Sequence, residues 1–144
     1  MARVALSQDF PAGVEKLWAI LSDPSRYGEW LGMHKQWKGD PPSSLTQGAQ
    51  LPPATVSLIN MPNTFVWTVE NVEAPRSYEL SATGMAGVKV NLTITVVPAE
   101  SGSTLTMDGE FTGAMITGAL ARAVEQAVTV DINESFSRLA ELAA

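Results

Sequence analysis

The stretch that decides the fold is ALARAVEQAVTVDINESFSRLAEL, residues 119–142, in a final segment, Ala114–Ala143, that contains no proline. Apolar side chains recur in it at spacings of four, four, four and three residues: Val124, Val128, Ile132, Phe136 and Leu139. This spacing forms one stripe on an α-helix. A helix of this length spans about 36 Å, more than twice the roughly 14–15 Å radius of gyration of a compact chain of this size. The predicted helix therefore crosses the whole molecule and needs a covering element.

Alternating apolar and polar residues predict that cover. A first strand over residues 2–10 is followed by a short helix over 14–21 and by a helical turn that Asp23 caps and Pro24 begins. Further strands are predicted in 49–59, with a late start after Pro52 and Pro53, and in 65–70, 77–82, 88–96 and 104–111. The turns between them are short, at 60–63, 74–76, 84–87 and 98–102. The expected architecture is α+β: one domain, 1–144, in which a curved antiparallel sheet of six to seven strands wraps the long C-terminal helix.

The composition excludes several function classes. Nine Lys and Arg are scattered against fifteen Asp and Glu, a net charge of −6, which disfavours nucleic acid and anionic membranes as partners. The chain has no cysteine and one histidine, and it lacks a P-loop, an EF-hand loop and a dinucleotide fingerprint, so no metal and no cofactor is predicted. No signal peptide and no apolar run of about 18 residues is visible, so a soluble cytoplasmic protein is the expectation.

Two local motifs extend the argument: Asp23–Leu31 reads DPSRYGEWL, and Ala74–Leu80 reads APRSYEL. Both resemble motifs of the START-like superfamily, also called SRPBCC, which includes polyketide cyclases, aromatase/cyclases and plant Bet v 1-type proteins. In many bacterial members proline stands at the position of Gly28. The resemblance covers the whole chain and implies the helix-grip fold, with two short helices after the first strand.

A narrower resemblance rests on four segments: WLGMHKQW at 30–37, FVWTV at 65–69, GVKV at 87–90 and DIN at 131–133. They look like an actinobacterial SRPBCC family described as the toxin of a type II toxin–antitoxin pair. That resemblance implies an antitoxin protein as a partner. It brings no catalytic motif that maps onto this chain.

A sheet curved around a helix leaves an apolar hollow, the usual form of a small-molecule site. The candidate ligand-binding residues are Trp30, His34, Phe65, Trp67, Met85, Met107, Met115, Ile116, Leu120, Val124 and Asp131. For each of them the alternative is ordinary core packing, a strand-edge histidine or a solvated helix flank. Gly109, on an inward position, adds room. We expect the helix entrance, Met115 to Val124, to border the cavity, and the half from Val128 to Leu139 to be structural packing.

Three hypotheses follow. The first is a non-enzymatic binder of a hydrophobic small molecule, lipid-like or aromatic, with Trp30, His34 and Asp131 as polar contacts. The second is the toxin component of a toxin–antitoxin pair that acts through protein–protein contact. The third is an enzyme of the polyketide cyclase or aromatase kind, with His34 as the proton carrier.

Overall fold

The computed structural model of the chain describes residues 1–84 and 87–144. Its elements, in chain order, are β1 (Ala2–Phe10), α1 (Val14–Leu21), η1 (Pro24–Arg26), α2 (Tyr27–Trp30), β2 (His34–Trp37), β3 (Ala54–Leu58), β4 (Met61–Glu73), β5 (Ser77–Thr83), β6 (Lys89–Ala99), β7 (Gly102–Thr112) and α3 (Gly118–Leu142). The strands form one antiparallel sheet in the order β1-β7-β6-β5-β4-β3-β2. The α+β architecture predicted from the sequence is confirmed.

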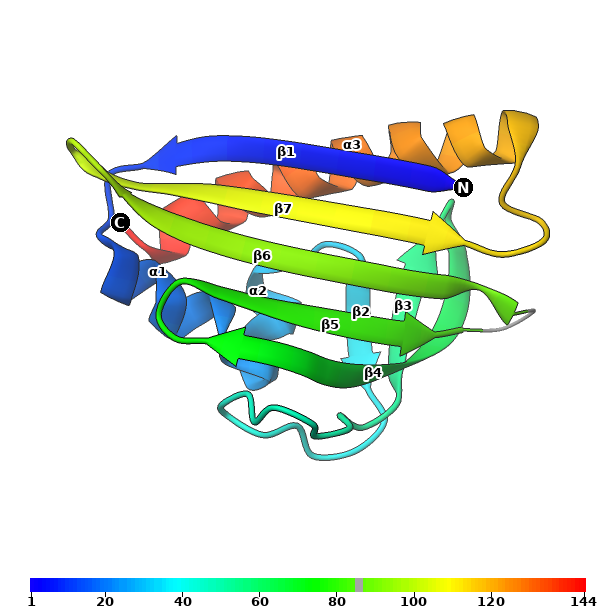
Figure 1. The fold of residues 1–144 in the computed structure, drawn as a ribbon, viewed down its shortest axis with the longest axis horizontal. Coiled ribbons are helices and arrows are strands. Elements are labelled where there is room, and N and C mark those ends of the chain that lie inside the picture. Colours follow the sequence, from blue (N-terminus) through cyan, green and yellow to red (C-terminus); the bar gives the residue numbers. More distant parts are fainter. Residues whose placement is uncertain (85–86) are drawn as a thin grey trace.

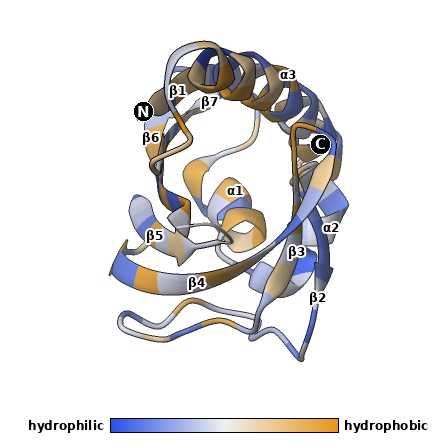
Figure 2. Cartoon of the chain, turned by 90° about the vertical axis from the view of Figure 1, so that its right-hand side faces the viewer, coloured by the Kyte–Doolittle hydropathy of each residue, from blue (hydrophilic) through white to orange (hydrophobic). Residues whose placement is uncertain are grey.

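The sheet curls around a central space, and α3 lies across its open side (Figure 1). Seen from the end, the strands run from β1 beside α3, round through β4, to β3 and β2 on the other side (Figure 2). The apolar stripe of α3 faces inward, and each of its five residues is 3% exposed or less. Burial of such side chains contributes about 1.5–3 kcal/mol each, so the helix and the sheet hold each other in place.

The short elements α1, η1 and α2 connect β1, at one edge of the curved sheet, to β2 at the other edge. The Asp23 carboxylate accepts a hydrogen bond from the Ser25 backbone N–H at 3.0 Å, which confirms the predicted cap of η1. After α2, the backbone N–H of Gly32 donates to Ser135 Oγ at 2.9 Å, and Ser135 Oγ donates to the Asp131 carbonyl at 2.7 Å. The buried Ser135 therefore attaches the segment that leads into β2 directly to α3.

The β3–β4 turn is tighter than expected. The sequence predicts a turn over 60–63, whereas Leu58 pairs with Met61 and the turn is Ile59–Asn60 alone. Both turn residues have positive φ, 52° and 58°, as in a two-residue type I′ turn. The prediction was wrong because a β-branched residue such as Ile59 is a poor signal for this conformation. The late start of β3, at Ala54 beyond the two prolines, is confirmed.

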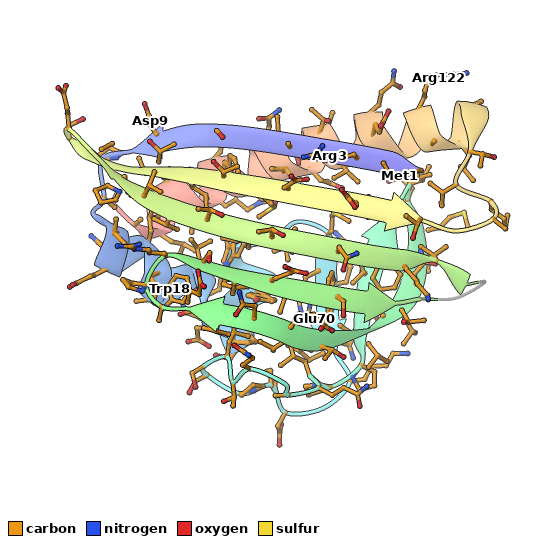
Figure 3. All side chains as sticks on the ribbon, in the orientation of Figure 1. Met1, Arg3, Asp9, Trp18, Glu70 and Arg122 are labelled. Atoms are coloured by element: carbon orange, nitrogen blue, oxygen red, sulfur yellow. The ribbon has the colours of Figure 1, made fainter. Side chains whose placement is uncertain are left out.

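Polar side chains cover the outer face of the sheet. Arg3 and Glu70 project outward from β1 and β4 (Figure 3), and Arg3 forms an ion pair with Asp108 of β7 at 2.8 Å. Among the described residues, no helix combines the length and the hydropathy of a membrane-spanning segment. The same part of the chain contains no group of three or more His, Asp or Glu side chains placed to share a metal ion. The inner face of the sheet is therefore the place to look for a site.

Candidate functional site

An apolar cavity lies between the inner face of the sheet and the middle of α3. Its wall consists of Tyr27, Leu31, Met33, His34, Val56, Phe65, Trp67, Leu80, Val90, Leu92, Met107, Gly109, Phe111, Val128 and Ile132. Strands β3 to β7 supply most of these residues, and the segment from α2 to β2 closes one side. The alternation of each strand places its apolar residues here, as the sequence pattern predicts.

The cavity is narrow. The space between its walls, including the part open to solvent, is about 620 Å³. Only about 40 Å³ of this space is accessible to the centre of a water molecule. This accessible part leaves room for a few water molecules. A larger ligand requires the flexible side chains Met33 and Met107, both on the wall, to change rotamer.

Gly109 contributes part of the remaining space. It lies opposite Leu92 on β6 and Val4 on β1, on the inward side of β7. A Cβ atom built there would be 3.6 Å from the Phe111 ring and 3.9 Å from Leu92, both ordinary contact distances. A methyl group would therefore fit, and its absence keeps the cavity open at this point.

An aromatic cluster lies at one end of the cavity, where Tyr27 and His34 are its members on the wall. The rings of Tyr27 and Trp37 are stacked with centroids 6.0 Å apart, and Trp30 packs edge-on against Tyr27 at 5.8 Å. The Tyr27 hydroxyl donates to Tyr78 at 3.2 Å, and the Tyr78 hydroxyl donates to the Leu21 carbonyl at 2.7 Å. Burial raises the pKa of both tyrosines, so both remain neutral donors. This network anchors the cluster to α1 and leaves the Tyr27 proton already engaged.

His34 lies within this cluster, at the start of the edge strand β2. It is 7% exposed, and its ring centroid is 4.7 Å from that of Trp37 and 6.2 Å from that of Tyr27. Neither imidazole nitrogen has a hydrogen-bond partner among the described residues. Burial lowers the pKa of His34 to about 4, because the apolar surroundings disfavour the charged ring. At neutral pH the cavity therefore presents a neutral imidazole, with one donor and one acceptor.

The structure brings four of the sequence candidates together on the cavity wall: His34, Phe65, Trp67 and Met107. Trp30, Ile116 and Val124 are buried but belong to the surrounding core. The indole N–H of Trp30 has no partner in the described part of the chain. Met85 lies outside the described residues.

Two candidates at the helix entrance lie on the surface. Met115 is 62% exposed and Leu120 is 36% exposed, so the expectation that they border the cavity was wrong. Figure 1 shows that the first turn of α3, which contains Leu120, extends beyond the N-terminal end of β1, whereas Met115 precedes the helix in the loop after β7. The cavity instead touches α3 at Val128 and Ile132, in the half that was expected to be plain packing.

Asp131 also lies away from the cavity wall. It is half-buried, and burial first and the neighbouring Glu134 second raise its pKa, against the opposing effect of Lys35 and Arg138. Its position on the flank of α3 matches the solvated-flank alternative. The wall residues that the sequence candidates omit include Tyr27, Leu31 and Met33, which flank His34 in the chain. Their proximity to the only histidine was the signal available for them.

Comparisons with known proteins agree with this geometry. Residues 1–144 match the family described as polyketide cyclase / dehydrase and lipid transport. The protein named Toxin Rv0910 from Mycobacterium tuberculosis H37Rv is 36% identical over 135 residues, 94% of this chain and 93% of that protein. Rv1546 from the same strain, described as uncharacterized, is 33% identical over 142 residues, 99% of each chain.

Solved structures with the same fold are more distant in sequence. A START superfamily protein from Mycobacterium smegmatis superimposes with a TM-score of 0.78 at 16% identity, covering 99% of each chain. Protein CV1439 from Chromobacterium violaceum gives a TM-score of 0.75 at 16% identity, covering 99% of this chain and 98% of that one. At these identities the structures show a shared START-like fold.

Proposed function

Because this chain belongs to the polyketide cyclase/dehydrase and lipid transport family, we propose that it binds a hydrophobic small molecule, lipid-like or aromatic, in the cavity between the sheet and α3. The observation that carries this proposal is a cavity wall made of uncharged side chains, with His34 as a hydrogen-bonding group whose imidazole has no partner in the described part of the chain. Small-molecule sites are typically apolar hollows with a few polar groups that fix orientation.

Binding without catalysis fits the wall better than a cyclase mechanism does. A general acid or base works best with a pKa near the working pH, whereas the pKa of His34 is about 4. The other ionisable wall residue, Tyr27, donates its proton to Tyr78 and has a raised pKa. Among the described residues, Tyr27 is paired only with the buried Tyr78, and the His34 imidazole is paired with no nucleophile or acid. These features favour His34 as a binding contact over His34 as a proton carrier.

Methyl NMR of methionine-labelled protein tests the proposal with reporters that the chain itself provides. Met33 and Met107 lie on the wall, whereas Met61 and Met115 are exposed on the surface. Titration with fatty alcohols and with two-ring aromatics is expected to shift the wall methyls and leave the surface methyls in place. Gly109→Val, which fills the cavity, should weaken the response, and Gly13→Val, at an open surface position, should not. No shift at Met33 or Met107 with any of these ligands would contradict the proposal.

A second candidate function is the toxin component of a type II toxin–antitoxin pair, acting through protein–protein contact. The observation that favours it is the 36% identity to a protein named as a toxin, over 94% of this chain. Growth arrest on expression, relieved by co-expression of a neighbouring antitoxin-like gene, is the expected result. Unimpaired growth at high expression would remove this candidate.

A further inference from the structure

We propose that the ligand of this cavity is electrically neutral and carries one hydroxyl or carbonyl oxygen that hydrogen-bonds to His34, and that carboxylates and phosphates are rejected. The inference rests on the proposed function, since it specifies which chemistry the same cavity accepts. It follows from two properties of the wall, its lack of charge and its single uncommitted imidazole.

The described part of the wall carries no charged side chain that could pair with a buried ionic group. Among the described residues that form it there is no Lys, Arg, Asp or Glu. The charged side chains on neighbouring segments, Lys35 and Asp131, are not part of the wall. An ionised group taken from water into such a site needs a paired charge or several hydrogen bonds, and otherwise binds in its neutral form. Anionic ligands therefore meet a large penalty here.

The second property is an unpaired polar group at a fixed position. The His34 ring is held between Tyr27 and Trp37, and its backbone N–H donates to the Leu31 carbonyl at 3.0 Å. A neutral imidazole can donate to a ligand oxygen from one nitrogen and accept from a hydroxyl at the other. A ligand without any polar atom would displace water from this ring and leave it unpaired, which costs affinity.

The other polar groups on the wall are weaker candidates for a hydrogen bond to the ligand. The Tyr27 proton is already donated to Tyr78. The Trp67 indole N–H has no hydrogen-bond partner among the described residues, and it can only donate. It is therefore the alternative group to which a ligand oxygen could bind, and the experiment must distinguish it from His34. Burial lowers the pKa of His34 to about 4, so the ring stays neutral around neutral pH.

A matched series of ligands tests the inference: 2-naphthol, 2-methylnaphthalene and 2-naphthoic acid, with binding followed at the Met33 and Met107 methyls. At pH 7 we expect 2-methylnaphthalene to bind about three- to tenfold more weakly than 2-naphthol, the usual effect of one hydrogen bond. The acid should bind at least about 100-fold more weakly, because a carboxyl group with a pKa of about 4 is almost fully ionised. Its apparent affinity should rise about tenfold per pH unit between pH 7 and pH 5.

His34→Phe identifies the anchor. This variant should lose the preference for 2-naphthol and bind 2-methylnaphthalene at least as tightly, because the naphthol hydroxyl would then be buried without a partner. Trp67→Phe should keep the preference for 2-naphthol. If Trp67→Phe removes the preference and His34→Phe does not, the assignment to His34 is overturned. Equal binding of 2-naphthoic acid and 2-naphthol at pH 7 overturns the neutral-ligand inference while leaving the proposed function intact. Failure of all three compounds to bind overturns the inference, and failure of the fatty alcohols as well overturns the proposed function.

Discussion

Gly109→Ala is expected to stabilise the protein, which is an unusual result for a substitution at a buried position. A glycine inside a strand costs about 0.5–1 kcal/mol relative to alanine, because it loses more backbone freedom on folding. The added methyl group would lie 3.6 Å from the Phe111 ring and would be buried without a clash. Burying one such group contributes about 0.8 kcal/mol. The two effects together predict a gain of about 1–2 kcal/mol in the free energy of unfolding.

The same substitution at Gly102, at the start of the same strand, provides the control. A Cβ atom there would clash with the Phe10 carbonyl oxygen and would be 2.7 Å from the Pro11 carbonyl group. Its φ of 155° also lies in a region that L-residues seldom adopt. Gly102→Ala should therefore cost at least about 2 kcal/mol, since backbone must move to admit the methyl. Two glycine-to-alanine changes in β7 thus have opposite predicted signs.

Urea unfolding measures both variants, with the slope against denaturant used to check that unfolding remains cooperative. For Gly109→Ala, thermal unfolding should shift upward by about 3–7 °C. A Gly109→Ala protein that keeps its fold but loses more than about 0.5 kcal/mol would refute the reasoning, because it would mean that the space beside Gly109 is already occupied. A stable Gly102→Ala protein would refute the clash.

Three further substitutions have defined outcomes. Ser135→Ala should cost about 1 kcal/mol in urea unfolding, because the part-buried Gly32 N–H loses its partner. Tyr78→Phe should cost a similar amount in thermal unfolding, because the Leu21 carbonyl loses its donor; an unchanged melting temperature would contradict this. The pKa of His34 is about 4 in the folded protein and about 6.5 in the unfolded chain. The neutral His34 ring therefore contributes fully to the free energy of unfolding above pH 6.5. That contribution, up to about 3 kcal/mol, is lost as the pH falls toward 4. In urea titrations between pH 4.5 and 7, His34→Phe should therefore show a flatter dependence than the wild type.

Most of the fold was predictable because its signals are local. The period of two in the strands and the spacing of Val124, Val128 and Ile132 in α3 each follow from which side is buried. The Ile59–Asn60 turn was not predictable, since isoleucine at a φ of 52° contradicts turn preferences and is held there by the two strands that it joins. At this turn, strand pairing overrides the local conformational preference of isoleucine.

The candidate site was predictable across the sheet but not along the helix. The alternation of inward and outward side chains along the strands predicted Phe65, Trp67 and Met107 on the cavity wall. The position of the cavity along α3 depends on how far the helix extends past the strands. The spacing of apolar residues in the sequence does not indicate this length. That distance exposes Leu120 and moves the contact to the middle of the helix, while Met115 is exposed in the loop that precedes the helix.

The pairing of β1 with β7 has a consequence for how the chain is made. Ser7 and Thr106 share a hydrogen bond across 99 residues, whereas β3 to β7 pair as consecutive hairpins. On the ribosome, at about 5–20 residues per second, the apolar side chains of β1 wait roughly 5–20 seconds for their partner strand. α3, which covers the inner face of the sheet, is synthesised later still. The nascent chain therefore spends most of its synthesis with an unpaired first strand, which is the state that chaperones would be expected to protect.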